Sequence, residues 1–255
     1  MSAIRIDSDA GITRITLARP QVRNAFDEQL VAELGLAFAR LPPATRVVVL
    51  AGDGPTFCAG ADLAWMQRSI GYSETENTRD ARQLLNMFQA IDSAPCVVIA
   101  RVLGAALGGG AGLAACCDIA VAASEARFGF PEVRLGLVPG VISSFVIRRV
   151  GAARARRYFL TGESFSAEEA RRIGLIDEVV AVEAIDSVID GLAQAVLHAG
   201  PRAVESAKRL VQVIEASDSA FAAEHAVTTL AGLRVQPEAQ EGMRAFLEKR
   251  TPRWL

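Results

Sequence analysis

The chain has 255 residues, of which 51% are hydrophobic, and a formal net charge of −2 at pH 7. That length suffices for a substantial core in one large domain or in two smaller ones. The balanced charge gives no electrostatic footprint for nucleic acid, and the longest apolar runs are interrupted by Arg101, Asp118 and glycines. We therefore expect neither a nucleic-acid partner nor a membrane span.

The cysteines and the N-terminal segment bear on compartment and cofactors. Cys58, Cys96, Cys116 and Cys117 show no spacing typical of a metal site. Adjacent Cys116 and Cys117 would form a strained disulfide, so buried free thiols in a reducing compartment are the better interpretation. The N-terminus lacks a basic segment followed by an apolar run, so we expect a cytoplasmic protein without a bound metal or redox cofactor.

The first half of the chain predicts strands that alternate with helices. Residues 4–17 alternate apolar and polar positions around Ser8-Asp9-Ala10-Gly11, which indicates a hairpin. Asp27 is placed to cap a helix that Pro42-Pro43 ends. Short buried strands are expected at 47–51, 96–102 and 119–122. The repeat of strand, glycine turn and helix indicates stacked βα units around an α/β core.

Longer helical stretches are also expected. Residues 68–82 should begin as a loop and become a helix that runs through Phe88, and another helix should begin near Gly109. Ser166-Ala167-Glu168-Glu169 has the pattern of a capping box, in which a hydroxyl group and a carboxylate satisfy free N–H groups of a helix. From Glu183 to the end the pattern is mostly helical, with a break at Gly200-Pro201.

Two turns and one carboxylate give the strongest chemical signal. Gly108-Gly109-Gly110 follows one expected strand, and residues 57–63 follow another in the same way. Small residues expose backbone N–H groups, and two such groups from parallel turns can meet at one oxygen as an oxyanion hole. Each motif alone is equally well explained as a tight structural turn. Glu132, which ends Phe128-Gly129-Phe130-Pro131-Glu132, is placed to move a proton, so together they indicate enolate chemistry on a carbonyl compound.

Other common catalytic patterns are missing. The glycine run does not satisfy the dinucleotide fingerprint, which needs a further glycine at Leu113, and no phosphate-loop motif is present. His198 and His225 both lie in the helical tail, where a surface or structural role is the simpler interpretation. A Ser-His-Asp hydrolase and a histidine-rich metal site are therefore poor hypotheses.

In an ordered set of motifs the chain resembles the enoyl-CoA hydratase/isomerase (crotonase) superfamily. The motifs are Arg19-Pro20, Asn24-Ala25, residues 57–63, Gly104, residues 108–110, residues 117–120, residues 128–136, Pro139-Gly140, Ala170, Gly174-Leu175, Glu241-Gly242 and residues 246–250. Two further stretches, 61–66 and 153–161, are most similar to the bacterial branch of methylglutaconyl-CoA and carboxygeranoyl-CoA hydratases. The set is specific for the superfamily but not for the reaction, because this fold hosts hydration, isomerisation, decarboxylation, hydrolysis and ring formation.

The resemblance implies a fold and an assembly. The fold would be an α/β spiral of ββα units, with a core and catalytic site in residues 1–195. Residues 196–255 would form a C-terminal helical region for oligomerisation. The implied assembly is a homotrimer or a dimer of trimers, and the implied substrate is an acyl-CoA thioester.

The resemblance also implies roles for individual residues. The N–H groups of Ala61 and Gly109 would bind the thioester oxygen, and Glu132 would be the acid and base. Coenzyme A, which belongs to the substrate and is not a permanent cofactor, would contact the backbone around Ala59, Ala61 and Leu63. Further substrate-binding residues would be Arg23 for the phosphates, Trp65 and Met66 for the acyl group, and Phe246 and Lys249 for the coenzyme A of a neighbouring subunit. Ordinary packing in a helix is an equally good interpretation of Trp65 and Met66.

One departure from the family pattern leaves the reaction open. Two-acid hydratases carry a glutamate two residues after the triple glycine, and Gly112 stands there instead. One carboxylate suits syn hydration of a branched acyl-CoA, which we favour, but it also suits a Δ3-Δ2 enoyl-CoA isomerase. A protein that binds a CoA ester or RNA with little activity is the third hypothesis. Candidates to hold a water molecule are Ser143, Ser144 and Glu163, and candidates to meet a second substrate carboxylate are Arg79 and Arg82.

Overall fold

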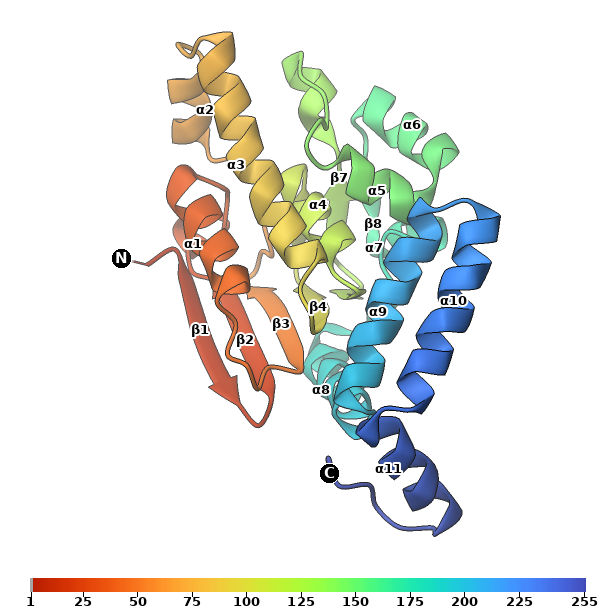
Figure 1. Cartoon of the computed structure of the whole chain (residues 1–255). Helices are drawn as coiled ribbons and strands as arrows, with labels where there is room; N and C mark the ends of the chain where they lie inside the picture. Colours follow the sequence, from red (N-terminus) through yellow and green to blue (C-terminus); the bar gives the residue numbers. More distant parts are fainter. Residues whose placement is uncertain (1) are drawn as a thin grey trace.

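The computed structural model describes residues 2–255, which form a six-stranded sheet, a three-stranded sheet and a helical C-terminal part (Figure 1). The large sheet has the strand order β1-β2-β3-β4-β6-β9. Its strands are β1 (Ile4–Asp9), β2 (Ile12–Leu17), β3 (Val47–Gly52), β4 (Val97–Val102), β6 (Ile119–Ala123) and β9 (Glu178–Val180). The small sheet is made of β5 (Ala105–Leu107), β7 (Arg127–Gly129) and β8 (Ser164–Ser166).

The helices cover the large sheet and extend beyond it. They are α1 (Glu28–Ala39), α2 (Leu63–Ser69), α3 (Glu74–Asp92), α4 (Gly109–Cys116), α5 (Ser143–Val150), α6 (Ala152–Thr161), α7 (Ala167–Ile173), α8 (Ile185–His198), α9 (Pro201–Ala216), α10 (Ser219–Arg234) and α11 (Pro237–Leu247). Short 3-10 turns lie at Pro20–Val22, Pro131–Leu135 and Val182–Ala184. This arrangement confirms the predicted α/β fold, and the expected hairpin is the antiparallel pair β1–β2.

The centre of the large sheet is buried on both faces, because strands β3, β4 and β6 are parallel and almost wholly apolar. In β3, Val48 and Leu50 face the main core, while Val47 and Val49 face the other side. Helix α8 covers that second face with Ile185, Ile189 and Ala193. The four cysteines are free and buried, as predicted, and burial raises the pKa of the Cys58 thiol to about 12.

One local prediction holds with a small change, and another needs correction. Residues 70–73 form the expected loop and α3 follows from Glu74, but Arg68 and Ser69 still belong to α2. The capping box expected at Ser166 is half formed: its hydroxyl accepts from the Glu169 N–H at 3.2 Å, but the Glu169 carboxylate binds Arg172 and Tyr158 instead of returning. A complete capping box lies at Ser73 and Glu76, where each side chain accepts from the other residue's N–H.

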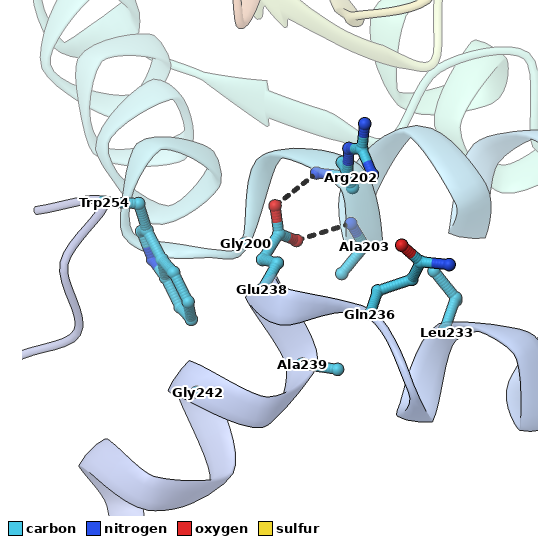
Figure 2. Close-up of a pocket in the computed structure, with 9 residues that line it drawn as sticks. All are labelled: Gly200, Arg202, Ala203, Leu233, Gln236, Glu238, Ala239, Gly242 and Trp254. Atoms are coloured by element: carbon cyan, nitrogen blue, oxygen red, sulfur yellow. Dashed lines mark hydrogen bonds between the residues drawn. The ribbon is translucent and has the colours of Figure 1, made fainter.

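Side-chain hydrogen bonds connect the helices of the C-terminal part to one another and to the end of α8. Helices α9 and α10 lie side by side, and α11 follows at the end remote from α2 and α3 (Figure 1). The Glu238 carboxylate on α11 accepts from the N–H groups of Arg202 and Ala203, both at 3.0 Å, and so caps α9 (Figure 2). Trp254 packs beside Gly242, and its indole N–H donates to the His198 carbonyl oxygen at 3.2 Å. The boundary we expect between residues 195 and 196 falls inside α8.

Among residues 2–255 no helix combines the length and the apolar character needed to cross a membrane.

Candidate active site

The first expected turn, at Ala61, presents a free backbone N–H group. Phe26 pairs with it as a short parallel bridge: the Phe26 N–H donates to Gly60 O at 2.7 Å, and the Asp62 N–H donates to Phe26 O at 2.8 Å. These bonds occupy the neighbours of Ala61, and its own N–H donates to no other described residue. The turn is thereby held from both sides while one donor stays available.

Charged side chains hold this turn in place. Asp62 caps α2 by accepting from the Ala64 N–H at 2.8 Å, and the Arg19 guanidinium lies 3.1 Å from the same carboxylate. Arg19 also pairs with Asp27, the cap of α1, at 2.8 Å. Burial acts to raise the pKa of Asp62, but the N–H groups of Ala64 and Trp65 and the charge of Arg19 lower it overall. Arg19 therefore joins the starts of two helices to the Ala61 turn.

The second expected turn is shaped by glycine. Gly108 has φ of +51°, a conformation that side chains rarely adopt, and α4 begins at Gly109. A Cβ atom at Gly109 would lie 2.7 Å from the Phe26 ring, and one at Gly110 would lie 2.2 Å from the Cys58 carbonyl oxygen. Only glycine fits this close approach. The Gly109 N–H has no partner among the described residues and points from the positive end of a helix.

The carboxylate of Glu132 lies against the glycine turn. Glu132 is on the 3-10 turn Pro131–Leu135, and a Cβ atom at Gly108 would lie 2.9 Å from its Oε1 atom. Its Oε2 atom is buried and has no hydrogen-bond partner among the described residues. Burial raises the pKa of Glu132 above the usual glutamate value, and a hydrogen bond from its own backbone N–H only partly opposes that shift. A carboxylate with an unpartnered Oε2 atom and a raised pKa is suited to accept and return a proton.

One cavity of about 470 Å³ brings both turns and Glu132 together. Of the residues expected from the sequence, it is lined by Ala59, Ala61, Leu63, Trp65, Met66, Gly109 and Glu132. Arg23 lies beside it, because its carbonyl oxygen accepts from the Ala59 N–H at 3.0 Å while its side chain is exposed. Phe246 and Lys249 do not line the cavity; Phe246 lies near the end of α11 and is 84% exposed, and Lys249 follows just after the helix.

The cavity has no room for a side chain at position 112. A Cβ atom on Gly112 would lie 2.3 Å from the Ile142 Cγ2 atom and 3.4 Å from the Phe88 ring. Ile142 is itself buried and lines the cavity. The Ile142 side chain therefore fills the space that the first glutamate of the two-acid pattern would need at position 112.

The residues we considered as candidates to hold a water molecule in place of the missing glutamate lie outside the cavity. Ser143 donates to the Gly140 carbonyl oxygen at 2.7 Å, and Glu163 pairs with Arg157 outside the cavity. Neither these two residues nor Ser144 lines it. Arg79 and Arg82 are exposed on α3 and do not line it either.

Sequence reasoning missed the second carboxylate of the cavity, Asp80. It lies on α3 with Asn77 and Leu84, which also line the cavity. The spacing of three and four residues places all three on one helix face, so the pattern could have been found by asking which polar residues share the face of Leu84. Burial and the charge of Glu28 raise the pKa of Asp80.

Comparison with known proteins agrees with this geometry. The model of the family described as enoyl-CoA hydratase/isomerase matches residues 7–255. The 2,3-dehydroadipyl-CoA hydratase of Escherichia coli is 34% identical over 257 residues, covering 99% of this chain and 98% of that protein. The crotonyl-CoA hydratase of Syntrophomonas wolfei is 32% identical, covering 97% of this chain and 95% of that protein.

Solved structures agree as well. The crystal structure of an enoyl-CoA hydratase from Shewanella pealeana superposes with a TM-score of 0.94 at 34% identity, covering 99% of this chain and 96% of that chain. Two free amide groups, a buried carboxylate beside them and a match along nearly the whole sequence all point the same way. The chain belongs to the enoyl-CoA hydratase/isomerase family.

Proposed function

We propose that this protein is an enoyl-CoA hydratase, which adds water to the double bond of an α,β-unsaturated acyl-CoA. The observation that carries the proposal is the position of Glu132: its Oε2 atom is buried and unpartnered, and the residue lines the cavity that holds the Ala61 and Gly109 amides. Family membership and relatives named as hydratases support the same assignment.

The proposed reaction uses the three groups together. Glu132 removes a proton from water as the water oxygen bonds to C3, and the electrons of the double bond move through C2 onto the thioester oxygen. The N–H groups of Ala61 and Gly109 stabilise the resulting enolate. Glu132 then returns the proton to C2, so hydrogen and hydroxyl add to the same face. The raised pKa of Glu132 helps it to perform both transfers.

We propose that the coenzyme A part of the substrate extends from the cavity over the Ala59 turn. The backbone around Ala59 and Leu63 borders that exit, and the exposed Arg23 side chain is placed to meet a phosphate group. This placement follows the family expectation. The protein would act in the cytoplasm, as we expect from the sequence.

We propose a homotrimer or a dimer of trimers as the working assembly. Helices α9–α11 expose an unusual amount of large apolar surface for a single chain. Its residues are Val211, Ile214, Phe221, Val227, Leu230, Val235, Met243, Phe246 and Leu247. Burial of this surface against a second copy would also bring Phe246 and Lys249 toward a neighbour's substrate.

The acyl group is proposed to be short and apolar, with branching allowed. Trp65, Met66, Leu84, Val141 and Ile142 give the cavity a mainly apolar lining. Arg79 and Arg82 lie outside it, so neither supports the idea of a second substrate carboxylate. A branched α,β-unsaturated acyl group without a second carboxylate is consistent with this lining.

A Δ3-Δ2 enoyl-CoA isomerase is the second candidate, and the filled position 112 favours it. Shifting a double bond needs one group that takes a proton from one carbon and returns it to another, and it needs no water. Glu132 alone meets that requirement, and Ile142 removes the space for a second acid beside it.

One experiment separates the two reactions. Crotonyl-CoA, 3-methylglutaconyl-CoA and a 3-enoyl-CoA are incubated with the protein in water enriched in heavy oxygen, and the products are analysed by mass. Heavy oxygen in a 3-hydroxyacyl product supports the hydratase. A conjugated product without label from the 3-enoyl ester, with no hydration of the other two, would replace it with the isomerase.

A further inference from the structure

Two buried polar side-chain atoms lack a hydrogen-bond partner within residues 2–255, and they belong to residues that line the same cavity. One is the Glu132 Oε2 atom and the other is the Trp65 indole nitrogen. Leaving a buried polar group unpaired costs about 1–3 kcal/mol, so such groups are rare unless a ligand or water meets them. One atom accepts a hydrogen bond and the other donates one, and a water molecule can make either bond.

A third polar group stands next to the Trp65 nitrogen. Trp65 lies on α2 and is 7% exposed, while Asp80 lies on α3 and is partly buried. Burial and Glu28 raise the pKa of Asp80, and the nearby indole N–H partly opposes that shift. The two side chains are therefore neighbours, yet the indole nitrogen has no hydrogen bond of ordinary length and angle. Both residues line the cavity, and the donor and the acceptor lie near each other without an ordinary hydrogen bond between them.

Water matches this arrangement better than any other component of the reaction. Its oxygen can accept from the Trp65 N–H, and its two hydrogens can be donated to Asp80 and Glu132. One lone pair then remains for the bond to C3. The hydration step needs such a second holder, because Glu132 alone cannot fix a water molecule, and Ile142 fills the space where another glutamate would reach in.

We propose that Trp65 and Asp80 hold the reacting water and take over the positioning task of the missing glutamate. This inference rests on the hydratase function proposed above. In the step, the bond between the water oxygen and C3 forms and the O–H bond facing Glu132 breaks. The proton goes to Glu132 and the double-bond electrons go to the thioester oxygen. Asp80 keeps its hydrogen bond to the other hydrogen throughout and neither gains nor loses a proton.

The test compares two activities of the same active site. Hydration of crotonyl-CoA needs a held water, whereas exchange of the C2 hydrogens of butyryl-CoA in heavy water needs only Glu132 and the two amides. The variants are Trp65→Phe, which removes the indole N–H, and Asp80→Asn, which keeps the size of the side chain. Arg82→Gln is the matched control, because Arg82 is exposed on the same helix and does not line the cavity.

We expect kcat for hydration to fall about tenfold or more in each variant, a loss typical of one removed hydrogen bond in a transition state. The exchange rate should stay within about twofold of wild type, as should both activities of Arg82→Gln. If Trp65→Phe does not fold, the hydration and exchange rates of Asp80→Asn alone decide whether the inference holds, because this substitution leaves no cavity in the core.

Three results would overturn the inference. Equal loss of hydration and exchange would mean that Trp65 and Asp80 only fasten α2 to α3. Unchanged hydration in both variants would mean that they do not touch the water. Wild-type protein that exchanges C2 hydrogens but hydrates no ester would refute the hydratase itself, an outcome that the wild-type assay reveals before any variant is compared.

Discussion

The two turns that supply the amide groups reach the same result by different physics. The Ala61 turn is held by charge, since Arg19 connects the caps Asp62 and Asp27 around it. The Gly109 turn is held by shape, since the Phe26 ring and the Cys58 carbonyl oxygen leave no room for a Cβ atom at Gly109 or Gly110. The Ala61 turn therefore depends on the charged side chains of Arg19, Asp62 and Asp27. The Gly109 turn depends on the absence of a side chain at residues 109 and 110. Each should fail under a different kind of substitution.

Replacing the group that both turns serve should give the largest effect. We expect Glu132→Gln to lower kcat about 10²–10⁴-fold, the range for loss of a general acid or base, while the Kd for an acyl-CoA stays near wild type. Both turns should survive, because the amide keeps the size of the side chain and Oε2 has no protein partner to lose. Kinetics with crotonyl-CoA and calorimetric binding of a saturated acyl-CoA would measure this. Near-normal turnover would refute the assigned role.

The glycine turn should respond to a single added carbon. In Gly109→Ala the new Cβ must displace the Phe26 ring or the turn itself, so the N–H group moves away from the oxygen that it should bind. Loss of one such donor lowers kcat about 10²–10³-fold. Steady-state kinetics measure the loss.

Gly191→Ala is the matched control for that substitution. Gly191 lies on the exposed side of α8, and a Cβ atom there would meet nothing within 4 Å. It should keep full activity and gain about 0.5–1 kcal/mol of stability, because glycine is a poor residue for a helix interior. Equal activity loss in both variants would show that shape at Gly109 is not what matters.

Sequence alone predicted the parts of the site whose chemistry is local. Glycines at 108–110, the cap Asp27 and the carboxylate Glu132 are each recognised within a few residues, and the structure places them as expected, while the catalytic roles of the glycine turn and Glu132 stay predictions. The strands of the small sheet, β5, β7 and β8, have three residues each, too few to show a periodic pattern, and none was predicted.

Features that depend on packing between distant segments were not predicted. Ile142 seals position 112 from 30 positions away in the chain, a contact that no local pattern records. Asp80 and Trp65 lie on two different helices, α3 and α2, that line one cavity, a placement that no local pattern records. The same limit explains why Ser143, Ser144 and Glu163 were proposed near the water: they follow the site in sequence, but they lie outside its cavity.

The charge-held turn should respond to loss of one cation. Arg19→Met keeps most of the length of the side chain but leaves Asp62 and Asp27 without their partner, and all three side chains are largely buried. Breaking a buried pair costs about 3–5 kcal/mol, and we expect about 3 kcal/mol here because some exposure remains. Urea unfolding measures the cost.

The activity of Arg19→Met tells whether the cation positions the amide as well as stabilising the fold. At a temperature where the variant is fully folded, kcat should still fall about tenfold, a smaller loss than for Gly109→Ala. Arg19→Lys should recover part of it. Arg5→Met serves as control, since Arg5 forms an exposed ion pair with Asp53 that involves neither Asp62 nor Asp27, and its removal should leave kcat unchanged. Full activity in folded Arg19→Met would limit its role to stability.

Shape also controls whether the missing acid can be restored. Gly112→Glu alone should lower stability by about 1–3 kcal/mol through overpacking, because the new Cβ would lie 2.3 Å from Ile142 Cγ2. Gly112→Glu combined with Ile142→Ala makes room and should recover part of that loss. Thermal unfolding of the two single variants and the double variant measures the coupling. Strict additivity would show that Ile142 does not exclude a side chain at 112.

The smallest expected effect is the change in thermal stability when the Glu132 carboxylate is replaced. Because burial raises the pKa of Glu132 in the folded protein, its ionised form is less favourable there than in the unfolded chain. That cost is absent below the pKa of the unfolded chain, appears as pH rises through the folded pKa, and persists at neutral pH. Glu132→Gln should therefore melt a few degrees higher than wild type at pH 7 and 8, a shift of about 1 kcal/mol or less.

The difference in Tm should shrink toward zero as pH falls below the usual range of glutamate, because the buried carboxyl group is then neutral in both proteins. The acidic limb of kcat/KM should lie above that range for the same reason, since Glu132 must be ionised to take a proton from water. A melting difference that is independent of pH would assign the gain to packing instead. Agreement between the two pH dependences would show that the protein accepts lower stability in order to keep an unpaired base beside its amide groups.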